Sequence, residues 1–362
     1  MTHPSPALRV GIVGGSGYAA GELARLLIEH PHVELTQVAS NSHAGDYLHA
    51  IHPHLRPSGE IAPMRMIAPE ALAPCDVLFL ALPHGQSMTA IERYRALAPR
   101  IIDLSADFRL RATTDYPRWY GHEHAQPAYL SRAVYGIPEL HRAELPEASL
   151  ISGAGCLATA AILGLRPLVQ AGILDQTLPM IIDAKVGSSA GGATADAASH
   201  HPTRSHAVRS FAPTGHRHTA ELRQELEWPD ATTDSGAAGI HFSATAIELV
   251  RGVLVTAHVF ARERMTDGDL WRIYRTAYGN EPFIRLIKER TGVYRLPEPK
   301  LLAGTNFCDI GFAVDPHSRR IVVLAALDNL VKGAAGNAVQ ALNAAMRWDE
   351  RTGLGFRGLH PV

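Results

Sequence analysis

Residues 11–18 read Gly-Ile-Val-Gly-Gly-Ser-Gly-Tyr, and they follow an apolar run at 8–13 and precede apolar residues at helical spacing in 18–30. Between a strand and a helix, glycines let the backbone approach a pyrophosphate, and the N-terminus of the helix supplies N–H donors to it. A plain tight turn is the alternative. The order strand, glycines, helix favours a dinucleotide site that includes Gly14, Ser16 and Gly17.

Apolar strands alternate with helices from residue 8 to about 155. Strands are expected at 8–13, 33–39, 77–82 and 101–104, with helices at 18–30 and from Gly85 to Leu97. Strands that are continuously apolar and separated by helices are typical of a parallel sheet covered on both faces. This pattern predicts an α/β fold with a Rossmann-type domain.

The later part of the chain has a different pattern. The stretch 157–165 is apolar on all sides and predicts a buried helix. The runs 179–186 and 241–260 alternate more and predict a mixed or antiparallel sheet, while 331–346 predicts a long closing helix. With 362 residues the chain is long for one core. We expect a nucleotide-binding domain at 1–155, a second α+β domain at 156–330, and a C-terminal part at 331–362 that packs back on the first domain.

Composition excludes several classes of protein. A net charge of −1 gives no sign of a nucleic-acid or membrane-surface partner. No stretch approaches the ~18–20 apolar residues of a membrane span, and the polar start at 1–7 lacks the apolar block of a signal peptide. The sequence therefore predicts a cytoplasmic protein.

The three cysteines are widely spaced and form no CxxC pair, which favours reduced thiols. Cys75 and Cys308 lie in or beside apolar strands and are expected to be packing residues. Cys156 follows Ser-Gly-Ala-Gly at the start of the apolar helix, where the helix dipole favours a reactive thiolate. We expect Cys156 to be a nucleophile.

Residues 215–219 read Gly-His-Arg-His-Thr. A distant histidine that serves a thiol is a common arrangement for nucleophilic catalysis. We expect His218 to be the general acid and base and His216 and Arg217 to hold the substrate, but the motif does not order the two histidines. A metal site is a weaker alternative, because both imidazoles would share one face of an extended strand but arginines and not carboxylates surround them.

Other cationic residues indicate an anionic ligand. The segment 197–220 contains Arg204, Arg209, Arg217 and five histidines but no Asp or Glu. It predicts contact with a phosphate, a carboxylate or an acidic partner, with a solvated loop as the alternative. In Asp103-Leu-Ser-Ala-Asp-Phe-Arg109, at the carboxyl edge of the sheet, Arg109 is a candidate for binding phosphate, and an ion pair with Asp103 or Asp107 is equally compatible with the sequence.

The end of the second predicted strand reads Val-Ala-Ser-Asn-Ser-His over 38–43. An NAD-selective site normally has Asp or Glu there, to hold the ribose hydroxyls. Ser40, Asn41 and Ser42 are hydrogen-bond donors that a 2′-phosphate would accept. NADP is therefore favoured, although the segment has no arginine.

Six motifs in order resemble the N-acetyl-gamma-glutamyl-phosphate reductases: Gly-Gly-Ser-Gly-Tyr at 14–18, Leu-Pro-His-Gly at 82–85, the 103–109 motif, Gly-Ala-Gly-Cys at 153–156, Pro-Thr-Gly-His-Arg-His-Thr-Ala-Glu at 213–221, and Leu-Asp-Asn-Leu-Val-Lys-Gly at 327–333. Gly-Ala-Gly-Cys is similar to the branch that reduces aminoadipyl phosphate on a small acidic amino-group carrier protein in lysine biosynthesis. Enzymes of arginine biosynthesis, which act on free N-acetylglutamyl phosphate, usually have Asn-Pro-Gly-Cys there.

The resemblance implies two domains, a homodimer or homotetramer, NADPH, and a thioester on Cys156 that is reduced to a semialdehyde. It maps cofactor contacts to Ser16, Gly17, Tyr18, Ala19, Ser40, Asn41, Ser42 and Asn329. Ser188 is placed with Arg109 and Arg217 among the substrate-binding residues. The chain departs from the family at Asn41 and Ser42, where arginines are common, and at Leu157, where the branch has a polar residue. Two alternatives concern the substrate: the enzyme reduces free N-acetylglutamyl phosphate, or it reduces carrier-bound glutamyl phosphate as well. Two others concern the class of protein, which would be a catalytically silent NADP-binding regulator or a thiol acyltransferase or hydrolase.

Overall fold

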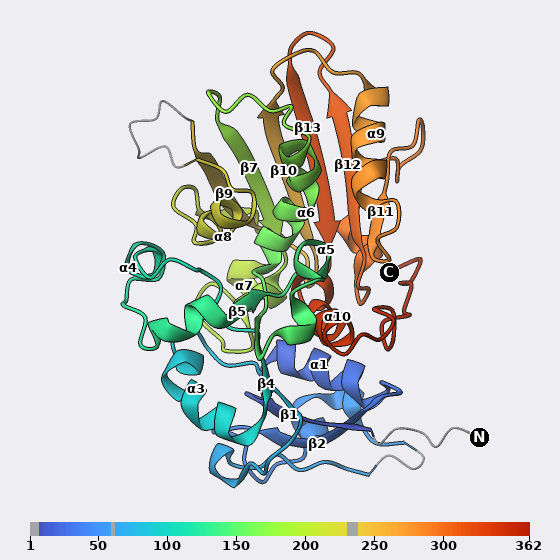
Figure 1. Cartoon of the computed structure of the whole chain (residues 1–362). Helices are drawn as coiled ribbons and strands as arrows, with labels where there is room; N and C mark the ends of the chain where they lie inside the picture. The colour runs from blue at the N-terminus through green and yellow to red at the C-terminus, as the bar shows by residue number, and fades with distance from the viewer. Residues whose placement is uncertain (1–6, 59–61, 230–237) are drawn as a thin grey trace, which may run out of the picture. The chain divides into compact units, whose positions relative to one another are not determined.

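The computed structural model describes residues 7–58, 62–229 and 238–362 and divides into two compact units (Figure 1). The first unit comprises the described residues of Met1–Thr114 together with Glu123–Ala154 and Ala334–Gly355. The second comprises Asp115–His122, the described residues of Gly155–Gly333, and Phe356–Val362. The polar start predicted at 1–7 lies outside the described residues except for Ala7. After Asp115–His122, the chain returns to the second unit at Gly155, one residue before Cys156.

The first unit contains a six-stranded sheet within its described residues, in the order β2-β1-β3-β4-β6-β5, and all of its pairings are parallel. The strands are β1 (Leu8–Val13), β2 (Val33–Ala39), β3 (Val77–Leu80), β4 (Arg100–Asp103), β5 (Ala133–Tyr135) and β6 (Leu150–Ser152). All four residues of β3 are buried, as expected where both faces of a parallel sheet are covered. The predicted Rossmann-type parallel sheet is confirmed.

The first unit has five α-helices within its described residues. They are α1 (Tyr18–Ile28), α2 (Leu48–Ile51), α3 (Gln86–Leu97), α5 (Pro138–His141) and α10 (Gly336–Ala345). Helix α1 packs on β1 and β2, and α3 packs on β3 and β4. Helix α10 contacts α1 and α5 and is buried along its whole length. Its buried amides have partners in this unit, since Asn337 donates to the carbonyl of Gly136 and Asn343 accepts from His30.

The second unit contains a seven-stranded mixed sheet within its described residues, in the order β11-β12-β13-β10-β7-β9-β8. Its strands are β7 (Met180–Val186), β8 (Arg209–Ala212), β9 (Ile240–Ala246), β10 (Val253–Phe260), β11 (Ile284–Leu286), β12 (Cys308–Val314) and β13 (Arg320–Leu327). The β7·β9 and β11·β12 pairs are parallel and the other four pairs are antiparallel. The predicted mixed sheet is confirmed.

The helices of the second unit explain the alternation of burial along its strands. They are α4 (Asp115–Tyr120), α6 (Cys156–Gln170), α7 (His201–Arg204), α8 (His218–Glu225) and α9 (Asp267–Tyr278). Helix α6 contacts β10, β12 and β13 and also its neighbours α8 and α9, so it lies on one face of the sheet (Figure 1). Every second residue of β10 is buried, as expected for a sheet with helices on one face. This placement accounts for the predicted burial of α6.

Two predicted elements differ in detail from the structure. The run predicted at 241–260 is two strands, β9 and β10, because the chain turns at 247–252, where Gly252 has φ +131°. The apolar residues of that turn hide it from a hydropathy pattern. The closing helix predicted at 331–346 begins as a π-helical turn, Val331–Ala335, and becomes α-helical only at Gly336.

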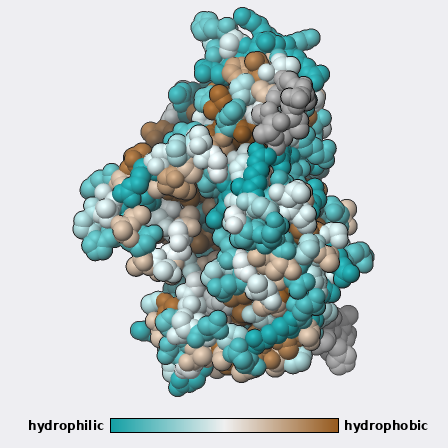
Figure 2. Space-filling model, turned by 90° about the vertical axis from the view of Figure 1, so that its left-hand side faces the viewer, coloured by the Kyte–Doolittle hydropathy of each residue, from teal (hydrophilic) through white to brown (hydrophobic). Residues whose placement is uncertain are grey.

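No helix among the described residues is both long and apolar enough to cross a bilayer. Hydrophobic residues make up 46% of the chain and fill the cores of the two units. On the face drawn in Figure 2, hydrophobic residues are interspersed with hydrophilic ones.

Candidate active site

The glycine loop between β1 and α1 is closely packed against the sheet. Gly14 has φ +91°, and a Cβ there would lie 2.3 Å from the carbonyl oxygen of Ala81. A Cβ on Gly15 would lie 2.4 Å from Val38, so both positions require glycine. Helix α1 begins at Tyr18 with no side-chain cap and no acidic residue in its first turn. Its first N–H groups are therefore oriented for an anion, which fits the pyrophosphate of a dinucleotide.

His52 supports this loop, and sequence reasoning missed it. The buried imidazole donates through Nε2 to the carbonyl oxygen of Gly15 at 2.7 Å. The ring also packs on α1 so closely that a Cβ on Gly21 would lie 2.4 Å from Nδ1. Burial lowers the pKa of His52, which favours the neutral ring. No local motif marks this role, because the contact joins residues that lie far apart in the sequence.

The loop that follows β2 carries the residues predicted to contact an adenosine phosphate. Asn41 and Ser42 are exposed, whereas Ser40 is buried and its hydroxyl donates to Ser16 in the glycine loop at 3.5 Å. The structure also brings Arg65 to this loop. The guanidinium donates to the carbonyl of Gly45 at 2.7 Å and lies over the ring of Tyr47. A cation is thus present that the 38–43 segment itself does not contain.

Cys156 is the first residue of α6, and it is the half-buried member of three cysteines that all belong to the described residues. Cys75 and Cys308 are buried, and burial raises the pKa of the Cys75 thiol. Gly333 contacts the nucleophile candidate directly, since a Cβ on that glycine would lie 2.6 Å from the Cβ of Cys156. The thiol therefore sits at a helix N-terminus with backbone packed closely against it.

His218 and Glu221 lie beside the residue that precedes the thiol. His218 is the buried first residue of α8, and a Cβ on Gly155 would lie 2.3 Å from its Nε2. Glu221 is fully buried. One of its carboxylate oxygens accepts from the N–H of Gly155 at 2.9 Å, and the other lies 3.7 Å from Nε2 of His218. The carboxylate therefore joins the imidazole to the start of α6.

Glu221 is a site residue that sequence reasoning missed. The signal was present, because residues three apart at the start of a helix share a face. The carboxylate oxygen of Glu221 lies within ion-pair distance of His218, so it faces the ring that is expected to carry the proton.

His216 has a different environment from His218. Its Nδ1 accepts the backbone N–H of His218 at 3.2 Å, and its ring stacks on Phe242 in β9. Burial, reinforced by the charge of Arg217, lowers the pKa of His216 to about 4. An imidazole that accepts a hydrogen bond at Nδ1 and resists protonation is suited to satisfying a backbone N–H at the start of a helix. It is poorly suited to donating protons.

The extended strand assumed for the metal alternative is wrong. His218 begins a helix and His216 lies in the turn before it, with ring centroids 4.5 Å apart at an interplanar angle of 82°. Among the described residues, no group of three His, Cys, Asp or Glu side chains could hold a metal ion.

Two family models match the chain in order. The NAD-binding domain of semialdehyde dehydrogenases matches residues 9–148, and their dimerisation domain matches residues 156–329. The chain belongs to the semialdehyde dehydrogenase family. The nucleotide loop lies in the first match, and the second begins at Cys156.

Individual relatives identify the branch of the family. A LysW-L-2-aminoadipate 6-phosphate reductase from Deinococcus radiodurans is 47% identical over 98% of this chain and 98% of its own. A protein from Thermomicrobium roseum, assigned the same activity by name, is 52% identical over 98% and 99%. The predicted resemblance is confirmed. The fold matches aspartate semialdehyde dehydrogenase II from Vibrio cholerae with a TM-score of 0.70 at 15% identity, over 95% of this chain and 99% of that one.

In this family member Arg109 contacts backbone. Its Nε donates to the carbonyl of Gly153 at 2.7 Å, close before the nucleophile candidate in sequence. Asp103 accepts from Ser87 and Ser105, and burial raises its pKa to about 6. Asp107 accepts backbone N–H groups at the start of α3. These contacts give both carboxylates a role in shaping the loops of the first unit.

Ser188 and Asn329 lie close together in the second unit. Ser188 is half-buried, and its backbone N–H donates to the carbonyl of Leu249. Asn329 is buried and donates through Nδ2 to Ser189 at 2.9 Å, while its Oδ1 accepts from the N–H of Gly252 at 2.8 Å. The assignment of Asn329 to the cofactor stays a prediction, and the structure adds that this amide cross-links two loops.

The cationic segment 197–220 is less uniformly positive in space than in sequence. Glu248, from the turn between β9 and β10, pairs with His206 at 3.0 Å. Arg204 donates to the carbonyl of Ile247, and Arg209 donates to that of Thr203. A neighbouring segment thus supplies a carboxylate that residues 197–220 do not contain. The three arginines of the segment still outnumber this one carboxylate.

Proposed function

We propose that the chain reduces L-2-aminoadipyl 6-phosphate, carried on a small amino-group carrier protein, to the semialdehyde with NADPH through a thioester on Cys156. The observation that carries this proposal is the placement of Cys156, His218 and Glu221 around the first turn of α6. The names of relatives at 47% and 52% identity support the choice of substrate.

Acyl transfer to sulfur is the first half of the proposed reaction. The thiolate of Cys156 attacks the carbonyl carbon, the C–S bond forms, and the C–O bond to phosphate breaks. Glu221 occupies the N–H of Gly155, so the first-turn N–H groups that follow it in α6 are the ones available to stabilise the oxyanion. A positioned imidazole contributes to such steps by moving the proton.

Reduction and release form the second half. A bound nicotinamide supplies hydride to the thioester carbonyl carbon. His218 provides the proton that the overall reaction consumes, and the C–S bond breaks to return the thiol and release the aldehyde. Glu221 stabilises the imidazolium and keeps its ring over Gly155.

Arg217 is the proposed contact for the acidic end of the substrate. It lies between the two histidines, and its Nε is buried with no acceptor among the described residues. A buried guanidinium N–H that lacks an acceptor is costly, and a carboxylate or phosphate oxygen would supply one.

The proposal is tested by comparing substrates in the reverse direction, with phosphate, NADP⁺ and the semialdehyde either carrier-bound or as free N-acetylglutamyl semialdehyde. We expect kcat/KM to be about 100-fold higher for the carrier-bound aminoadipyl substrate, since ~2.7 kcal/mol of carrier contact is modest for an interface. Equal kcat/KM for the free substrate would identify the arginine-pathway reaction instead. NADPH formation that does not require phosphate would contradict the acyl-phosphate chemistry.

Carrier recognition is proposed to use the cationic segment. Replacing Arg204 and Arg209, which are both half-buried, with alanine should raise KM for the carrier-bound substrate several-fold at low salt and less at high salt, because salt screens charges that solvent reaches, over ~10 Å at 0.1 M. Arg272→Ala, which removes an exposed arginine from α9, is the matched control. If KM of the double variant equalled the wild-type value at every salt concentration, this surface would not bind the carrier.

Selectivity for NADP is proposed to depend on Arg65. Arg65→Gln should weaken NADP⁺ binding about tenfold, or ~1.4 kcal/mol, and leave NAD⁺ binding unchanged, because only NADP⁺ carries the 2′-phosphate. Binding is measured by titration calorimetry without substrate. The control is Arg93→Gln, a half-exposed arginine that contacts Glu70 and Pro69. An equal loss for both nucleotides would mean that Arg65 only holds the loop together.

A further inference from the structure

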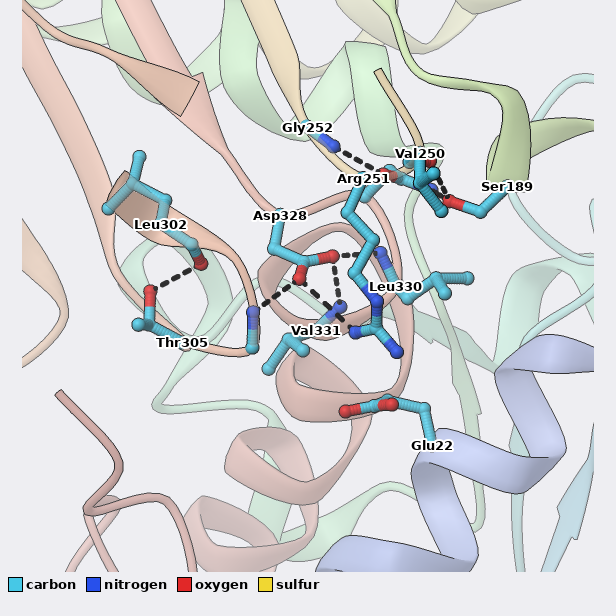
Figure 3. A network of polar contacts seen from close by, with 12 residues as sticks. Glu22, Ser189, Val250, Arg251, Gly252, Leu302, Thr305, Asp328, Leu330 and Val331 are labelled. Atoms are coloured by element: carbon cyan, nitrogen blue, oxygen red, sulfur yellow. Dashed lines mark hydrogen bonds and ion pairs between the residues drawn. The ribbon is translucent and has the colours of Figure 1, made fainter. Parts of the chain in front are cut away.

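Asp328 directly follows the last residue of β13, and its carboxylate makes polar contacts with several other segments (Figure 3). The side chain is fully buried. Its Oδ2 accepts the N–H of Gly304 at 2.6 Å and lies 3.3 Å from a guanidinium nitrogen of Arg251. Its Oδ1 accepts the N–H of Leu330 at 2.7 Å and that of Val331 at 3.3 Å. One carboxylate thus holds three segments of the second unit.

Asn329, the neighbour of Asp328, ties down the same region. It links Gly252 to Ser189, and the hydroxyl of Ser189 donates to the carbonyl of Val250 at 2.6 Å. Figure 3 shows Arg251, Leu330 and Val331 on one side of Asp328 and the segment of Leu302 and Thr305 on the other. The turn that carries Arg251 is therefore fastened to the end of β13 at several points.

The turn at 330–333, which hydrogen-bonds to Asp328, contacts Cys156 at its far end. The N–H of Gly333 donates to the backbone carbonyl of Asp328 at 2.9 Å, and Gly333 packs against Cys156 with no room for a Cβ. This stretch is the π-helical turn Val331–Ala335. Insertions of this kind are rare and occur frequently at functional sites.

A fully buried carboxylate needs compensation for lost hydration, and Asp328 obtains it from backbone N–H groups and one arginine. The same bonds leave the turn little freedom to shift. Because the far end of the turn contacts Cys156, a change in the turn would alter the packing around the thiol.

We propose that Asp328 is a positioning residue for Cys156 and acts through the 330–333 turn. The inference rests on the proposed function only in taking Cys156 as the nucleophile. It predicts that loss of the Asp328 charge lowers the reactivity of the thiol itself, beyond any change in stability.

The test compares Asp328→Asn with Asp309→Asn. Asp309 is also buried and pairs with Arg285 through both oxygens at 2.6 and 2.8 Å, but it lies on β12 next to the edge strand β11. Asparagine keeps the shape of each side chain and places an N–H₂ where a donor already points. We expect kcat and the rate of Cys156 alkylation by iodoacetamide to fall together about 10- to 100-fold in Asp328→Asn, with KM for NADPH near the wild-type value. Asp309→Asn should keep both rates within about twofold.

A second pair of variants tests the proposal if Asp328→Asn fails to fold. Gly333→Ala adds a methyl group against Cys156, whereas Gly268→Ala, on α9, adds one with ordinary clearance from Thr266. Alkylation, followed across pH with the modified cysteine assigned by mass spectrometry, should slow in the first and not in the second. Wild-type alkylation rates in folded Asp328→Asn or in Gly333→Ala would overturn the proposal. An active Cys156→Ser variant would instead overturn the proposed function.

Discussion

Cys156→Ser is expected to abolish semialdehyde formation while NADP⁺ binding stays at the wild-type level. The serine hydroxyl is not ionised at neutral pH, so the variant has no nucleophile comparable to a thiolate. A loss of about 10³-fold or more in kcat is typical when a covalent nucleophile is removed. The glycine loop lies in the other unit from Cys156, which is why the binding of NADP⁺, measured by calorimetry, should not change.

The control is Cys75→Ala, which removes a buried thiol of the first unit whose Sγ donates to the carbonyl of Val77. It should retain most of the activity. A direct observation is also available, because wild-type protein mixed with acyl phosphate in the absence of NADPH should release about one equivalent of phosphate and gain the acyl mass on Cys156. Full activity of the serine variant would rule out the thioester route.

The order of strands and helices in the first unit could be predicted because local pattern decides it. Strand β2 was expected at the residues where it is found, and α3 was expected to follow Gly85. The short strands β5 and β6 were not predicted, since three-residue strands have too few residues to show a period. They are strands because neighbouring parallel strands supply their hydrogen-bond partners, which is tertiary information.

The types of residue that form the site could be predicted from the sequence, but the contacts between them could not. The sequence indicated Cys156 and a histidine pair, and helix-terminus physics explains why the thiol stands at the start of α6. It did not reveal that Glu221 bonds the N–H of Gly155, that Arg65 reaches the loop after β2, or that Gly333 packs on Cys156. Each of these contacts joins segments far apart in the chain, so no spacing rule contains it.

His218→Asn is expected to lower kcat about 10²- to 10⁴-fold, the usual contribution of a general acid and base, whereas His216→Asn should keep kcat within about tenfold. Asparagine retains a carbonyl oxygen that can accept the backbone N–H at the start of α8, as Nδ1 of His216 does. It has no group that can deliver a proton at the position of Nε2 in His218. The pair of variants, assayed by steady-state kinetics on the same substrate, orders the two histidines that the motif leaves unordered.

The pH dependence provides an independent check on His216. Its pKa in the folded protein is about 4, below the ordinary 6.5, so folding favours the neutral ring. The stability that this ring contributes is fully present above pH 6.5 and is lost as pH falls toward 4, because the unfolded chain then binds the proton more readily. Thermal unfolding should therefore show a smaller loss of stability between pH 6.5 and 4 in His216→Asn than in wild type. If kcat depended on an ionisation near neutral pH that His216→Asn removed and His218→Asn kept, the roles of the two residues would be reversed.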